Sequence, residues 1–190
     1  YWVHQLEEYS LPVMGLPYSL PDMVCGQFGF APYPECPIPM TFYPVVNISL
    51  MWFGAPLAAY ICRRNVLIGL SSWGLIMANG FVHSAGGIAE GTYNTGLLTA
   101  AFLFIPLSLW VIYACAIRGP YSGKVVGTAI AAGAVTHAVL FVGYGLFKAG
   151  VIGNAGLVVY GAVVGFTPII LAALASRFFK PELLRPVAVR

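Results

Sequence analysis

The first ten residues carry one histidine and two carboxylates at a spacing that suits metal binding. His4 and Glu8 are one helical turn apart and Glu7 follows His4 at i+3, so a helix would place all three on one face. Uncompensated carboxylates are costly in hydrocarbon, and membrane chains that keep them point them into the protein interior. Mixed imidazole and carboxylate donors suit Zn²⁺, with Fe or Mn as alternatives. The competing interpretation is a solvated helix end near the lipid headgroups.

Two further histidines lie inside apolar stretches, at His83 and His137. Asn79 precedes His83 by four residues, so a helix would present both on one face. A single histidine within a membrane is more often a hydrogen-bonded packing residue than a ligand, but three helices aiming polar groups at one depth favour a shared site. The predicted metal ligands are His4, Glu8, His83 and His137. Glu7 is expected to act as a general base or second ligand, and Asn79 to orient His83 or the substrate.

The composition is that of a multi-pass membrane protein. Of 190 residues, 59% are hydrophobic and 8% are charged, against about 25% charged in soluble domains. The net charge of +3 comes from basic residues at the ends of apolar stretches, which is the positive-inside pattern and indicates no nucleic-acid partner. The expected partners are the lipid bilayer, a lipid-like substrate and other membrane subunits.

These stretches predict a single membrane domain over residues 1–190: an all-α polytopic bundle of about six spans. The chain begins with Tyr1 rather than Met, and residues 1–11 are expected to be the end of a first, partial helix. Each later stretch is long enough to cross about 30 Å of hydrocarbon. The predicted spans are 45–62, 66–88, 95–117, 125–147 and 151–176. Residues 177–190 would form a cytoplasmic tail.

Residues 11–44 contain eight of the fourteen prolines and predict an extracytoplasmic loop that covers the bundle. The segment has Asp22 and Glu35 but no Lys or Arg, which assigns it to the non-cytoplasmic side and places both termini inside. Cys25 and Cys36 would meet oxidising conditions there. Sequence alone leaves a disulfide and two free thiols equally open.

Three motifs lie in order along the chain: His4-x-x-Glu7-Glu8, Asn79-x-x-x-His83 and Tyr93-Asn94-Thr95-Gly96. Over residues 2–110 they resemble the HXXEE family, bacterial integral membrane proteins of uncharacterised function. The third motif of that family reads Tyr-x-Pro-Gly; here Thr95 replaces the proline, while Tyr93 and Gly96 remain. The resemblance implies a membrane-embedded, metal-dependent enzyme of the bacterial inner membrane, with residues 11–44 in the periplasm.

These observations favour a hydrolase-like metalloenzyme that acts on a lipid-like or periplasmic substrate. The alternative is a non-catalytic transmembrane subunit of a larger membrane complex, in which the motif residues form a structural polar network. A transporter that relays protons through buried Glu and His is a third hypothesis, but the sequence has no internal repeat to support it.

Overall fold

A computed structural model describes residues 1–9, 19–91 and 93–180 of the chain. The expected all-α membrane bundle is confirmed, since the described residues form helices and no strand. Four of these helices are long and apolar enough to cross a membrane, or five if a bent pair counts as one span. Two parts of the sequence prediction lie outside the described residues: positions 10–18, at the end of the first helix and the start of the loop, and positions 181–190 of the tail.

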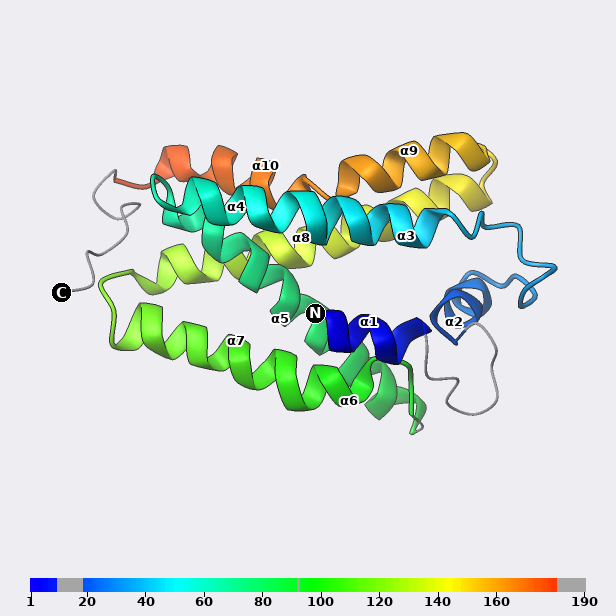
Figure 1. The fold of residues 1–190 in the computed structure, drawn as a ribbon, viewed down its shortest axis with the longest axis horizontal. Helices are drawn as coiled ribbons and strands as arrows, with labels where there is room; N and C mark the ends of the chain where they lie inside the picture. The colour runs from blue at the N-terminus through cyan, green and yellow to red at the C-terminus, as the bar shows by residue number, and fades with distance from the viewer. Residues whose placement is uncertain (10–18, 92, 181–190) are drawn as a thin grey trace.

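Spans that follow one another in the chain run in opposite directions along the long axis of the molecule (Figure 1). Two of them are continuous α-helices, and two combine α-helical and π-helical turns. The continuous spans are α5 (Val66–Glu90) and α8 (Gly123–Lys148). The mixed spans are α3 (Phe42–Asn47), η2 (Ile48–Gly54) and α4 (Ala55–Cys62), then α6 (Leu97–Thr99), η3 (Ala100–Phe104), α7 (Ile105–Ile112) and η4 (Tyr113–Ile117).

Proline positions account for the irregular spans. Pro56 and Pro106 lie in the first turns of α4 and α7, each directly after a π-helical segment. A proline ring clashes with the carbonyl one turn earlier, so the preceding turn widens. The stretch expected as one span over 151–176 is bent by 46° between α9 (Asn154–Val164) and α10 (Thr167–Ala175), and Pro168 begins the new axis.

The expectation that 11–44 is entirely loop is wrong for residues 19–27, which form helix α2 (Ser19–Gln27). The span expected from residue 45 also begins earlier, at Phe42. Both differences have the same cause: Pro21 and Pro44 are the third residues of their helices. The first-turn N–H groups of a helix have no acceptor within it, so a proline there removes no hydrogen bond.

The lid, defined here as described residues 19–41, is fastened to itself and to the bundle. Cys25 and Cys36 form a disulfide, which settles the alternative that the sequence left open. Lys148, at the end of α8, donates a hydrogen bond to the Phe28 carbonyl oxygen at 2.6 Å and lies 5.9 Å from the centre of the Phe30 ring. This lysine on the otherwise acidic side therefore holds the lid over the bundle.

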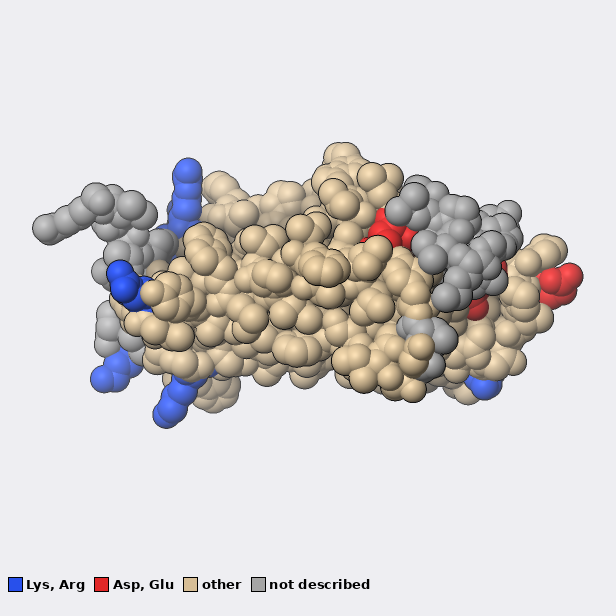
Figure 2. Space-filling model, turned by 90° about the horizontal axis from the view of Figure 1, so that it is seen from below, with Lys and Arg blue, Asp and Glu red and all other residues tan. Residues whose placement is uncertain are grey.

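Charge is separated along the molecule. Figure 2 shows most of the Lys and Arg at one end, acidic residues toward the other, and an uncharged belt between them. Large apolar side chains on this belt face outward, with Trp52, Phe102 and Trp110 each more than half exposed. An outward apolar surface between two polar ends is the pattern of a membrane-spanning bundle.

Helices α5 and α8 pack closely through glycines, and this contact gives a test of the fold. A methyl group at Gly133 of α8 would overlap the backbone of Gly74 and Leu75 on α5, whereas one at Gly127 would meet nothing within 4 Å. We expect Gly133→Ala to destabilise the protein by about 1–3 kcal/mol and Gly127→Ala to leave it unchanged or stabilise it. Thermal unfolding of the purified variants in one detergent measures this. Equal unfolding temperatures would contradict the packing described.

Candidate metal centre

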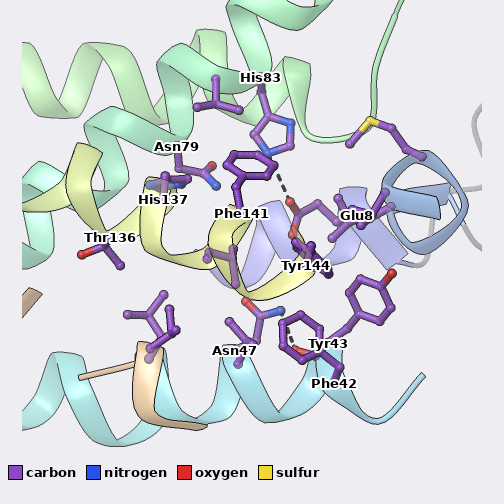
Figure 3. A pocket seen from close by; sticks show the side chains of 18 of the residues that line it. Glu8, Phe42, Tyr43, Asn47, Asn79, His83, Thr136, His137, Phe141 and Tyr144 are labelled. Atoms are coloured by element: carbon purple, nitrogen blue, oxygen red, sulfur yellow. Dashed lines mark hydrogen bonds and ion pairs between the residues drawn. The ribbon is translucent and has the colours of Figure 1, made fainter. Parts of the chain in front are cut away.

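Two imidazoles and one carboxylate meet near the acidic end of the bundle. His4 and Glu8 lie on α1 (Trp2–Tyr9), and His83 lies on α5. The Nε2 atoms of His4 and His83 lie 3.1 and 3.2 Å from the same oxygen, Glu8 Oε1. Figure 3 shows His83 pointing from its helix toward Glu8. The exposed fractions are 0% for His4, 4% for Glu8 and 6% for His83, so bulk water screens none of the three.

The neighbouring carboxylate, Glu7, has a different environment. Its two oxygens accept hydrogen bonds from the Tyr93 hydroxyl at 2.5 Å, the Leu98 N–H at 2.9 Å, and the Thr99 N–H and hydroxyl at 2.8 and 2.5 Å. Leu98 and Thr99 begin the span that starts at α6, so Glu7 caps that helix from another segment of the chain. All of these contacts are donors to Glu7, which suits an ionised carboxylate that acts as an anchor.

Thr99 connects Glu7 to His4 and makes the Nδ1 atom of the imidazole a hydrogen-bond donor. The Thr99 hydroxyl donates its single hydrogen to Glu7, so its oxygen is left to accept the hydrogen of His4 Nδ1, 2.6 Å away. In the neutral imidazole, His4 Nε2 then directs a lone pair at the Glu8 carboxylate. Within the described residues this buried nitrogen has no hydrogen-bond partner. Two electron-pair donors 3.1 Å apart need a cation between them, either a metal ion or a proton.

The third motif shapes the site from the loop between α5 and α6. Gly96 has φ +90°, and a Cβ there would lie 2.7 Å from His4 Cε1 and 2.9 Å from His83 Cε1. Only glycine lets the backbone approach both imidazoles in this conformation. Tyr93 holds Glu7, and burial, followed by that hydrogen bond and the Glu7 charge, raises the pKa of its phenol well above the usual value. The loop therefore positions both histidines and Glu7.

A cavity of about 160 Å³ begins at this centre and extends into the bundle between α1, α2, α3, α5, α8 and α9. Glu8, His83, Asn79 and Asn94 line it, as does His137. Asn94 donates from Nδ2 to the His83 carbonyl oxygen at 2.8 Å, which orients its amide. The Oδ1 atoms of Asn79 and Asn94 are buried and have no hydrogen-bond partner among the described residues. They are available to a bound molecule.

The structure does not bring His137 into the three-residue centre. One ligand atom each from His4, Glu8 and His83 lies within 4.8 Å of the others, and this group does not include His137. The His137 Nδ1 atom is instead 3.1 Å from the Gly133 carbonyl oxygen one turn earlier in α8, and the ring forms part of the cavity wall. Counting residues gave its depth along the helix but not the direction of its side chain.

Thr99 was not among the residues expected at the site. It is uncharged, lies outside the three motifs and begins an apolar span, where a threonine is unremarkable in sequence. The one available signal was its position three residues after Gly96. If the loop motif lies at the site, the first helical turn after the loop lies near the site too.

The fold and the site define a class of protein: a helical bundle with apolar spans and a buried His–Glu–His centre at one end. The family model described as "Protein of unknown function with HXXEE motif" matches residues 1–111, and the chain belongs to this family. Comparisons with curated proteins and with solved structures find no match.

Gly96 and Gly91 allow the imidazole contacts to be tested separately from backbone strain. Both have positive φ, but a Cβ at Gly91 would meet nothing within 4 Å, whereas at Gly96 it would meet both imidazoles. We expect Gly91→Ala to cost about 1–2 kcal/mol from backbone strain, and Gly96→Ala to cost about 1–3 kcal/mol more. Thermal unfolding of both variants gives the comparison. Equal losses would mean that Gly96 makes no special room for the histidines.

Proposed function

We propose that this protein is a membrane-embedded, metal-dependent enzyme that hydrolyses a lipid-like substrate. The observation that carries the proposal is the approach of two buried imidazole nitrogens to one carboxylate oxygen. Burying this arrangement without a cation would be costly.

The donor set fits a catalytic zinc site. Zn–N and Zn–O bonds of about 2.0–2.2 Å in tetrahedral geometry place neighbouring ligand atoms roughly 3.3 Å apart, and the two distances to Glu8 Oε1 are 3.1 and 3.2 Å. Two histidines and one glutamate leave a fourth position open, as in known zinc hydrolases. Fe and Mn are the alternative ions for this donor set. Bound there, the ion would lower the pKa of a coordinated water and polarise a substrate carbonyl.

The other residues then take supporting roles. Because Glu7 already accepts four hydrogen bonds, we assign it to anchoring Thr99 and the α6 turn instead of the base role that its sequence position favoured. Asn79 and Asn94 present amide oxygens to the cavity and would orient the substrate. His137 would be part of the substrate wall.

The charge distribution supports a location for this chemistry. Arg63 and Arg64 follow the end of α4 and Lys124 lies at the start of α8, at the end of the bundle away from the lid. The positive-inside rule assigns this end to the cytoplasm. The lid, with its acidic residues and its disulfide, would then face an oxidising compartment. We propose the bacterial inner membrane, with the lid and the metal centre on the periplasmic side.

Metal content separates the enzyme hypothesis from a purely structural network. We expect purified protein to bind one zinc ion per chain. Loss of a residue that only orients a metal ligand lowers metal affinity roughly 10–100-fold. Glu8→Gln and His83→Ala remove ligands themselves and should lower zinc affinity by more than this. His137→Ala is the matched control and should keep its zinc. The measurement is zinc titration followed by elemental analysis. Wild-type protein without bound metal would favour a protonated His–Glu–His network in a non-catalytic subunit.

Thr99 gives a second test, because it holds a ligand and would not touch the ion. Thr99→Val keeps the shape but removes the hydroxyl that accepts the His4 Nδ1 hydrogen, so zinc affinity should fall roughly 10–100-fold. Thr99→Ser keeps the hydroxyl and should restore most of the affinity. Competition with a chromophoric chelator measures both variants. Equal affinity in the valine and serine variants would remove the proposed link from Glu7 through Thr99 to His4.

A further inference from the structure

The cavity at the candidate metal centre is elongated along the bundle. On α5 its lining runs from Gly86 past His83 back to Leu75, and on α8 from Tyr144 back to Thr136. From His83 to Leu75 and from Tyr144 to Thr136 are eight residues each, or about 12 Å at 1.5 Å per residue. The two helices run in the same direction, so the cavity extends from the metal centre toward the middle of the bundle (Figure 3).

The two ends of this cavity differ in polarity. The outer end carries the Glu8 carboxylate, the His83 imidazole and the Asn94 amide beside side chains of α2, whereas the inner end is lined by Leu50, Leu75 and Val164. Thr136 and His137 also lie at the inner end, but each is bonded within α8: the Thr136 hydroxyl donates to the Ala132 carbonyl oxygen at 2.8 Å, and His137 Nδ1 lies 3.1 Å from the Gly133 carbonyl oxygen. The inner wall therefore offers mainly carbon to a ligand, and the outer end offers polar atoms.

The volume limits what enters. A cavity of about 150 Å³ in another protein holds a single benzene molecule, and this one is about 160 Å³. Such a space has room for one short apolar chain but not for the paired chains of a diacyl lipid. The head must also supply a hydrogen-bond donor, because the Asn94 Oδ1 atom, on a side chain only 8% exposed, has no partner among the described residues.

We propose that this cavity binds the chain of a single-chain lipid whose head carries an N–H or O–H donor. The head lies against Glu8, His83 and Asn94, and the chain end lies between Leu50, Leu75 and Val164. The assignment of the head rests on the proposed metal function, and the assignment of the chain rests on the shape and lining of the cavity. A fatty amide or a monoacyl ester has this chemistry, and a diacyl phospholipid does not.

Photolabelling tests the proposal directly. The probe is octyl hydroxamate with a diazirine at the chain end, since a hydroxamate head both donates hydrogen bonds and binds metal. It is added to the whole protein in detergent with zinc, and the labelled peptides are mapped by mass spectrometry. We expect labels at the inner end, on peptides containing Leu75 or Val164, and loss of these labels when unlabelled octyl hydroxamate competes.

A matched pair of variants sharpens the result. Leu50→Trp would fill the inner end and should abolish the inner label. Leu57 lies on the same span, is not among the residues that line the cavity and is 42% exposed. Leu57→Trp should therefore keep the label. Far-ultraviolet circular dichroism checks that both variants fold. Labels found only on the outward belt, or an inner label that persists in folded Leu50→Trp, would overturn the proposal.

Zinc content measured on the same samples distinguishes the two levels of the proposal. Zinc-loaded wild-type protein without an inner label overturns the chain site alone. An inner label in protein that binds no zinc supports the chain site and overturns the metal function. If neither the inner label nor zinc is found, the chain site and the metal function are both overturned. Wild-type protein alone, labelled with and without the competitor, gives this result.

Discussion

A buried carboxylate between two imidazoles is the constraint on which the rest of this structure depends. Glu8 is almost completely removed from water, and its ionised form in a low-dielectric interior needs a nearby positive charge. Both histidine nitrogens approach the same oxygen. The three side chains supply electron pairs, and a metal ion or a proton between them would supply the positive charge. This arrangement, more than the presence of histidine or glutamate alone, connects the geometry to metal chemistry.

The two consecutive glutamates show how environment separates the roles of identical side chains. Glu7 faces the start of the α6 span and is surrounded by hydrogen-bond donors, while Glu8 faces the cavity and the imidazoles. Adjacent residues on a helix point about 100° apart, so they meet different neighbours. The three motifs join in one assembly: the first supplies two donors and an anchor, the second supplies His83 and Asn79, and the third brings the backbone close at Gly96.

Much of the fold could be predicted because long apolar stretches in a membrane chain mark the membrane-spanning helices. The helical spacing of His4 and Glu8 also followed from sequence, since i and i+4 share a face. The direction of His137 did not, because depth along a helix says nothing about rotation around it. Thr99 was missed since an uncharged threonine has no signal until the residues beside it are known. Helix α2 departs from the expected loop because its proline, Pro21, lies in the first turn, where a helix tolerates proline.

X-ray absorption at the zinc edge of the purified protein tests the central claim most directly, because it reports the atoms bound to the ion. The account predicts a shell of nitrogen and oxygen atoms at about 2.0–2.2 Å with the outer scattering of two imidazoles, reduced to one in His83→Ala. A zinc spectrum without imidazole scattering, or protein that takes up no zinc at all, would contradict it.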